Sequence, residues 1–275
     1  ETMPMPFLAP GDLENAGLSS TAISISNPLV QEESLLRTSL MPGQLKIISY
    51  NQSHRIKKLK FFEIGHVYLP SEDNQLLPDE REYLSISIAG GDATEIVAIL
   101  DMISLTMAFP NMQLKQQEIE GLHPGRSAQV FVAGQERGAV GEVDPRVLRN
   151  YGIDDSVAWL ELDLGSILAG PFGKKKYTSV SKYPSSDIDL AFEVPDDTSS
   201  ASVAGCLRKA GGTYLKEVQL FDSYKADTAN ERVRSLAYSL RFQSDEGTLT
   251  DAEVSELRAA CISEVEQKTN AKLRE

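Results

Sequence analysis

The chain has 275 residues, enough for about two domains, and 41% of them are hydrophobic, which supports real cores and excludes a disordered chain. The net charge of −13 argues against a general nucleic-acid binder, because such proteins are usually basic. No apolar run approaches the roughly 20 residues of a membrane-spanning helix. Cys206 and Cys261 both fall in helix-like apolar patterns, so we expect a cytoplasmic protein with reduced cysteines.

The hydrophobic patterns in residues 1–170 predict a mixed, mostly antiparallel sheet with helices on one face. Apolar patterns predict strands at 61–69, 83–89, 127–133, 138–143 and 157–164. Helical spacing or capping signals predict helices near 42–51, at 94–109 and after Asp144. The basic run at 54–60 fits a solvated helix end as well as a contact with a partner.

A linker is expected at residues 171–177. The sequence GPFGKKK at 170–176 combines glycine, proline and lysine without any hydrophobic periodicity. This linker would separate a domain at 1–170 from a second domain at 178–275.

The region after the linker predicts the order β-α-β-β-α-β, which is the split βαβ pattern of ferredoxin-like folds. A strand at 188–194 precedes a helix that is capped by Ser199 or Ser200. A hairpin at 216–242 follows. Thr250 and Glu253 predict a capping box for the last helix, and a short strand is expected at 271–273.

The hairpin at 216–242 carries the main candidate for a binding site. Val218, Leu220, Asp222 and Tyr224 share one parity, so a regular strand would place all four on one face. An aromatic ring at a strand end, surrounded by basic residues, suits stacking on an unpaired base. Pattern alone favours a second interpretation, an ordinary amphipathic hairpin with a solvated loop.

No signature of catalysis is visible in the sequence. Phosphate-binding glycine loops are absent, and the three histidines have no metal-ligand spacing. Glu161 and Asp163 share a strand face, but nothing marks them as an acid–base pair. We therefore expect a non-catalytic chain that binds no metal or cofactor itself.

Several segments together resemble the C-terminal part of the bacterial phenylalanyl-tRNA synthetase β subunit. They include LRTSLMPGQL at 36–45, FFEIGHVYLP at 61–70, LHPGRSA at 122–128 and GEVDPRVL at 141–148, followed by KYPSSDIDLAFEV, LFDSY, SLAYSLRF and TLTDAEV. The segments follow the family's order along nearly the whole chain.

The resemblance implies an inactive domain of class II synthetase type at 1–170 and a ferredoxin-fold anticodon-binding domain at 178–275. It also implies a catalytic α subunit in an α2β2 assembly. ATP and Mg would serve the whole enzyme, and tRNA(Phe) would be the RNA partner. The acidic composition keeps an alternative open: a protein–protein assembly module with no RNA contact.

The resemblance also suggests functional residues. The family's LFDxY motif maps onto 220–224, so Asp222 and Tyr224 are expected to face the anticodon base. The expected RNA contacts also include Lys225, Arg234 and Arg241, and the expected subunit interface includes Leu36, Arg37, Lys57 and Lys58. Ile188 stands where the family usually has arginine, which removes one expected basic contact.

Overall fold

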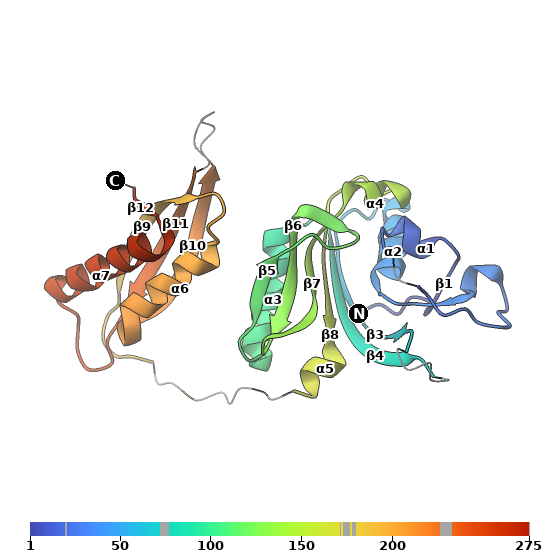
Figure 1. The fold of residues 1–275 in the computed structure, drawn as a ribbon, viewed down its shortest axis with the longest axis horizontal. Coiled ribbons are helices and arrows are strands. Elements are labelled where there is room, and N and C mark those ends of the chain that lie inside the picture. Colours follow the sequence, from blue (N-terminus) through green and yellow to red (C-terminus); the bar gives the residue numbers. More distant parts are fainter. Residues whose placement is uncertain are drawn as a thin grey trace. The chain divides into compact units, whose positions relative to one another are not determined.

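The computed structural model describes residues 1–19, 21–71, 77–170, 172, 177, 180–225 and 233–274, except for the side chain of Lys225. The chain divides into two compact units, Glu1–Lys176 and Tyr177–Glu275 (Figure 1). This division falls inside the expected linker. Most of residues 171–177 lie outside the described part, so the linker itself stays a prediction.

The first unit is built on a six-stranded sheet in the order β3-β4-β8-β7-β6-β5, and every neighbouring pair is antiparallel. The strands are β3 (Leu59–Leu69), β4 (Asp79–Ala89), β5 (Gln113–Gln116), β6 (Leu122–Val132), β7 (Gln135–Val143) and β8 (Val157–Asp163). Ala133 and Gly134, both at positive φ, form the tight turn between β6 and β7.

Helices cover both faces of this sheet, whereas the sequence predicted helices on one face only. The helix α3 (Ala93–Met107) packs Ile96 and Leu100 against Leu160 of β8. On the other face, α2 (Met41–Ser53) and α4 (Pro145–Asn150) surround Trp159. Every residue of β8 is buried, because this strand lies between the two layers (Figure 1).

Short elements complete the first unit, and the sequence patterns did not predict them. They are β1 (Phe7–Leu8), α1 (Asp12–Asn15), η1 (Gln31–Glu33), β2 (Leu35–Leu36) and α5 (Leu164–Leu168). β1 and β2 pair with each other as a small separate sheet. Elements of two to five residues carry too little periodicity to be seen in sequence.

The second unit has an antiparallel sheet in the order β10-β11-β9-β12. Its elements are β9 (Ser186–Pro195), α6 (Ser200–Gly211), η2 (Gly212–Tyr214), β10 (Leu215–Lys225), β11 (Val233–Phe242), α7 (Asp251–Thr269) and β12 (Lys272–Leu273). Both helices lie on one face of the sheet (Figure 1). This strand order confirms the ferredoxin-like prediction, and the antiparallel sheets with packed helices confirm the α+β fold class.

The core of the second unit lies between this sheet and its helices. Alternate residues of the central strands point to the helices, and the buried set comprises Leu190, Phe192 and Val194 of β9 and Leu236, Tyr238, Leu240 and Phe242 of β11. Cys261 of α7 belongs to this core, whereas Cys206 of α6 is only partly buried. The predicted caps are confirmed: Ser199 accepts from the Ser202 amide, and Thr250 and Glu253 form the capping box.

Within the described ranges, no helix is long and apolar enough to cross a membrane. No cluster of three or more His, Cys, Asp or Glu side chains in the same ranges is placed to hold a metal ion.

Candidate nucleic-acid interface

One face of the second sheet is covered by neither α6 nor α7, and we call it the open face. It consists of the residues that alternate with the buried set. On β11 these are Ser235, Ala237, Ser239 and Arg241, and on β9 they are Asp187, Asp189, Ala191 and Glu193. Because cross-strand partners share a face, the register then shows on which face each paired residue of β10 and β12 lies.

A β-bulge in β10 decides where Asp222 and Tyr224 lie. Leu220 pairs with Tyr238, but Asp222 pairs with Ala237, so Phe221 is one extra residue in the strand. The extra residue reverses the alternation. Val218 and Leu220 therefore lie on the helix side, and Asp222 and Tyr224 lie on the open face. The prediction that all four share one face was wrong, because parity assumes an unbroken ladder.

Tyr224 and Asp222 remain together on the open face after this correction. Tyr224 pairs with Ser235, and its side chain is 57% exposed. The two residues are separated by about 6–7 Å along the strand. Neither side chain has a hydrogen bond or ion pair with another described side chain, so both are free to meet a ligand.

The centre of the open face is formed by small side chains. Ser235, Ala237 and Ser239 follow one another along β11, and Ala191 lies beside Ala237 on β9. A planar base could approach the backbone closely over these residues, with the Tyr224 ring standing at one side. A sheet surface that carries exposed aromatic rings is a common platform for binding single-stranded RNA.

Arg241 lies on the open face but is already paired. Its guanidinium donates to both carboxylate oxygens of Asp187, at 2.9 and 3.1 Å, and to Glu217 at 3.1 Å. This contact lowers the pKa of Asp187. Arg241 is also six residues from Ser235, which is about 20 Å along a strand. The structure therefore does not bring Arg241 next to Tyr224.

Arg234 lies on the opposite side of the sheet from Asp222 and Tyr224. It pairs with Val194 of the core and donates through Nη2 to the carbonyl of Thr198. Its Nε is buried and has no hydrogen-bond partner among the described residues. Lys225 is the register partner of Arg234, but its side chain lies outside the described residues. The expected basic cluster is thus not assembled on one face.

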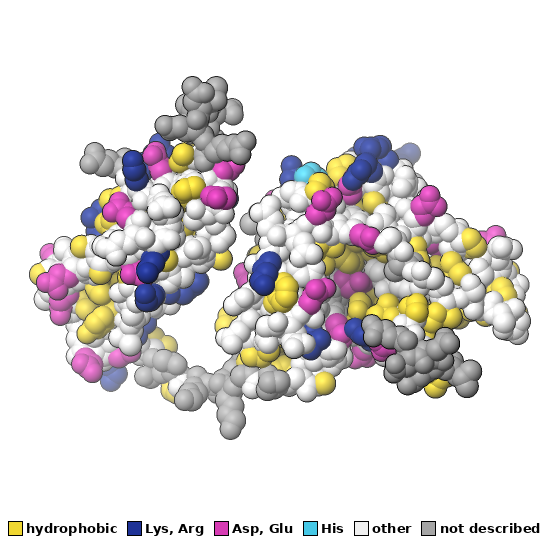
Figure 2. Space-filling model, viewed as in Figure 1, with side chains coloured by type: hydrophobic (Ala, Val, Ile, Leu, Met, Phe, Trp, Pro, Cys, Tyr) yellow, Lys and Arg dark blue, Asp and Glu magenta, His cyan; other side chains and the backbone are white. Residues whose placement is uncertain are grey.

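Two further features bear on RNA binding. Ile188, which replaces the expected arginine, packs against the core of the second unit. In the view of Figure 2, acidic and basic side chains are interspersed over the described part of each unit, without a broad basic surface there. Any RNA contact must therefore be local, with little help from long-range attraction.

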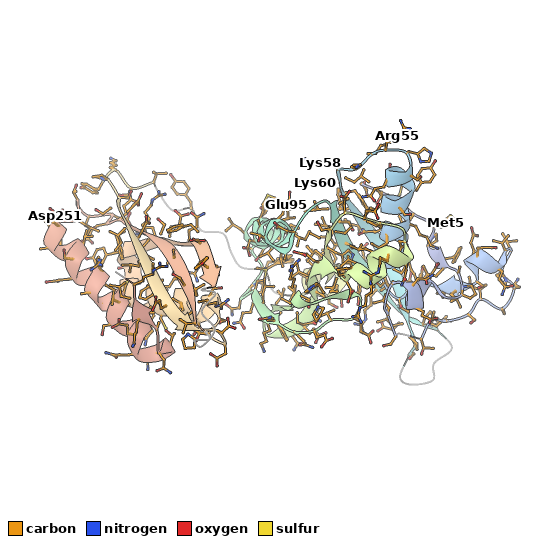
Figure 3. The ribbon with its side chains drawn as sticks, turned by 90° about the horizontal axis from the view of Figure 1, so that it is seen from above. Met5, Arg55, Lys58, Lys60, Glu95 and Asp251 are labelled. Carbon is orange, nitrogen blue, oxygen red and sulfur yellow. The ribbon has the colours of Figure 1, made fainter. Side chains whose placement is uncertain are left out.

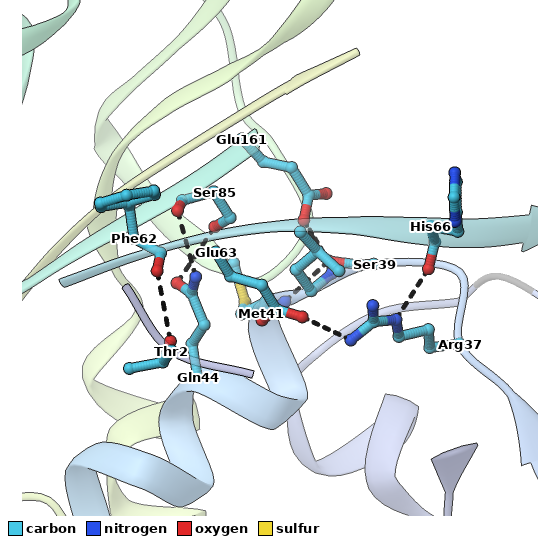
Figure 4. Close-up of polar contacts among 11 residues, drawn as sticks. Thr2, Arg37, Ser39, Met41, Gln44, Phe62, Glu63, His66, Ser85 and Glu161 are labelled. Atoms are coloured by element: carbon cyan, nitrogen blue, oxygen red, sulfur yellow. Dashed lines mark hydrogen bonds and ion pairs between the residues drawn. The ribbon is translucent and has the colours of Figure 1, made fainter. Parts of the chain in front are cut away.

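The first unit contains the residues that were expected at a subunit interface. Leu36 is half-buried in β2, where it pairs with Phe7. Arg37 is only 7% exposed; it pairs with Glu63, with 2.6 Å between Nη1 and Oε1, and donates to the carbonyl of His66 (Figure 4). Gly65 leaves room for the guanidinium, which a Cβ there would contact too closely. The Arg37 side chain is thus largely enclosed within the unit.

Lys57 and Lys58 are exposed between the end of α2 and the start of β3. Arg55 and Lys58 project from this connection, and Lys60 reaches Glu95 of α3 (Figure 3). Tyr50, which is 66% exposed, lies at the same end of α2, and its ring centroid is 4.4 Å from that of His54 in a tilted arrangement. This surface combines positive charge with an exposed aromatic ring, and aromatic side chains are enriched at protein interfaces.

Sequence reasoning missed a polar cluster beneath α2 (Figure 4). Glu161 accepts from the Leu40 amide at 2.7 Å and from the Ser39 hydroxyl at 3.2 Å, at the start of the helix. Burial raises the pKa of Glu161 to about 7, and the Glu63 carboxylate adds to the shift. Gln44 bonds Ser85 and Ser87 nearby. Only the tertiary fold could reveal this cluster, because its members come from distant segments.

Family comparisons agree with both units. A family model described as the phenylalanyl tRNA synthetase beta chain CLM domain matches residues 1–164. The chain belongs to the phenylalanyl-tRNA synthetase beta chain family. A second model, the ferredoxin-fold anticodon binding domain, matches residues 181–274. The resemblance seen in the sequence is thereby confirmed.

Individual members of the family show the extent of the similarity. A phenylalanine–tRNA ligase beta subunit from Clostridium tetani is 34% identical over 254 residues, which is 92% of this chain and 32% of the relative. The subunit from Geobacter metallireducens is 28% identical and covers 100% of this chain and 36% of its own length. The chain thus spans about a third of the length of these curated relatives.

A solved structure, Desulfitobacterium hafniense PylSc, a pyrrolysyl tRNA synthetase, is similar with a TM-score of 0.46 and 16% identity. The match covers 61% of this chain and 60% of that chain.

Proposed function

We propose that the chain recognises the anticodon of tRNA(Phe) through the open face of its second unit. It does so as part of an ATP-dependent phenylalanine–tRNA ligase. The Tyr224 ring stacks on one anticodon base, and the Asp222 carboxylate accepts hydrogen bonds from the edge of that base. A guanine can supply both an amino and an imino donor on its Watson–Crick edge.

One observation carries this proposal: Tyr224 and Asp222 lie exposed on the same face, beside a floor of small side chains, and neither has a side-chain partner among the described residues. The match of residues 181–274 to an anticodon-binding domain supports the same conclusion. Arg241 would reach a phosphate only by exchanging its carboxylate partners, so Tyr224 and Asp222 are the principal contacts.

The first unit would support assembly with a catalytic α subunit. β3 is an edge strand of the six-stranded sheet, and its Phe62 and Ile64 are exposed. An exposed apolar edge strand is a common site of association. Lys57 and Lys58 lie just before this strand, so the basic surface and the apolar edge are continuous along the chain.

Amino-acid activation is assigned to the α subunit, which would bind ATP and Mg. The chain alone is then non-catalytic. The buried carboxylates of the first unit hold α2 and Arg37 in place, and this structural role accounts for their contacts without any substrate. ATP–pyrophosphate exchange by this chain, free of α subunit, should stay at background.

Direct RNA binding tests the anticodon proposal. Labelled tRNA(Phe) is titrated with the whole chain at low and high salt, and an unlabelled tRNA with an altered first anticodon base is the competitor. We expect binding that weakens with salt and a poorer competitor than tRNA(Phe). No binding at low salt, or equal competition by both tRNAs, would favour the alternative of an assembly module without RNA contact.

A further inference from the structure

A cation that the sequence did not single out lies next to the proposed base site. Arg274 follows β12, and its amide donates to the carbonyl of Ala191 at 2.8 Å, which extends the pairing with β9. Leu273, the residue before it, faces the core opposite Phe192. Alternation then places the Arg274 side chain on the open face.

The guanidinium of Arg274 reaches across β9 toward β11. Its Nη1 lies 3.5 Å from the hydroxyl of Ser235. Ser235 is the register partner of Tyr224 on the other side. In the register, Arg274 lies in the row of Ala191, Ala237 and Asp222, and its guanidinium reaches diagonally to Ser235, the partner of Tyr224. Arg241 lies six residues from Ser235 along β11.

Arg274 also differs from Arg241, the other described arginine of this face, in its charge balance. Arg241 is held by two carboxylates, Asp187 and Glu217, whereas Lys272 lies opposite Glu193 in the register without an ion pair among the described residues. Arg274 has no ion pair with any described carboxylate. The open face carries several acidic residues, so a polyanion would be repelled over most of it. A guanidinium without a described carboxylate partner therefore marks the position where a phosphate can bind.

We propose that Arg274 binds a backbone phosphate of the anticodon, next to the base that stacks on Tyr224. The inference rests on the proposed function and adds a positioning contact to it. A guanidinium matches two phosphate oxygens with two parallel N–H donors. Ser235 and the paired backbone of Arg274 orient this fork before RNA arrives, which lowers the entropic cost of binding.

The test measures the affinity of the whole chain for a labelled anticodon stem–loop of tRNA(Phe) over a series of salt concentrations. Arg274→Ala should weaken binding about ten-fold at low salt, as expected for a charge-assisted contact. It should lower the salt slope by about 0.7, the value for one phosphate of a single strand. Arg274→Lys should keep the slope and recover part of the affinity.

A stem–loop with an altered first anticodon base separates phosphate binding from base reading. Arg274→Ala should weaken both stem–loops by the same factor, because phosphates carry no sequence information. Arg258→Ala on α7 is the matched control: it removes the same charge from the same unit and should leave affinity nearly unchanged.

Two results would overturn the inference. The first is unchanged affinity in Arg274→Ala while Tyr224→Ala weakens binding; this outcome leaves the anticodon site in place without Arg274. The second is a loss confined to the cognate stem–loop with an unchanged salt slope, which would assign Arg274 to a base. If neither Arg274→Ala nor Tyr224→Ala weakens binding, the proposed function fails as well.

Discussion

Arg37 and Glu63 form an ion pair inside the first unit, with 2.6 Å between Nη1 and Oε1. Glu63 Oε2 is buried and has no partner among the described residues, so Arg37 is the main compensation for this carboxylate. Burial raises the pKa of Glu63, and the Arg37 charge opposes that shift.

Arg37→Ala should therefore destabilise the first unit by about 3–5 kcal/mol, because it leaves a buried charge unpaired. Urea unfolding followed by the fluorescence of Trp159, the single tryptophan of the chain, reports on this unit alone. Adding Glu63→Gln should restore part of the loss. Arg146→Ala, which removes an exposed guanidinium from the buried N-cap residue Asp144, should have a smaller effect on the midpoint. A similar effect of Arg37→Ala and Arg146→Ala would contradict the assignment.

Glu161 should make the stability of the first unit depend on pH. Its pKa rises from 4.5 to about 7 on folding, so the folded chain binds the proton more tightly than the unfolded chain. The stability from this proton is fully present below pH 4.5 and is lost as pH rises through about 7, by up to about 3 kcal/mol.

Glu161→Gln should flatten this part of the pH profile, because glutamine still accepts from Leu40 but does not ionise. The measurement is the urea midpoint by Trp159 fluorescence between pH 5 and 8. Glu136→Gln, at an exposed position of β7, is the control and should keep the wild-type profile. Parallel profiles for wild type and Glu161→Gln would show that Glu161 ionises normally.

Charge reversal at Lys57 and Lys58 should weaken assembly with the α subunit without unfolding the chain, because both side chains are exposed. Co-purification with α subunit, at matched concentrations, measures the effect. Lys115→Glu with Arg149→Glu makes the same charge change elsewhere on the first unit and should leave assembly intact. Equal assembly of both double variants would favour a simply solvated basic run.

Asp222→Asn should relax discrimination at the first anticodon base, because asparagine presents a neutral acceptor in place of a carboxylate. The preference for tRNA(Phe) over the altered tRNA should fall by roughly ten-fold. Asp189→Asn removes the same charge from the same face, opposite Ser239, and should leave the preference unchanged. A fall of similar size in both variants would point to general charge repulsion.

The sequence predicted the fold of the second unit well, because its elements are long and each has a strong local signal. Thr250 with Glu253 marked the start of α7, and the alternation of β9 and β11 identified the core residues. The faces of β10 were harder to predict. A bulge depends on pairing with β11, and Phe221 carries no local sign of it.

The structure places the predicted basic residues on different faces of the sheet, because proximity in the sequence does not define a face. Arg234 and Ser235 are neighbours in the chain but lie on opposite sides of the sheet. Arg274 is distant in sequence from Tyr224, yet its guanidinium contacts Ser235, the register partner of Tyr224. Arg37 was expected at an interface, but only the fold shows that Glu63 and the His66 carbonyl enclose it.

The most direct measurement of the central claim is tRNA charging by the assembled ligase with Tyr224→Ala. Loss of one stacking contact of about 1–3 kcal/mol should raise the KM for tRNA(Phe) by roughly ten-fold or more. Phenylalanine activation should stay unchanged, because it is assigned to the α subunit. Tyr214→Ala, which truncates an exposed tyrosine beside Leu257 on the helix side, should leave the KM unaltered. An unchanged KM in Tyr224→Ala, or an equal rise in both variants, would contradict the open face as the anticodon site.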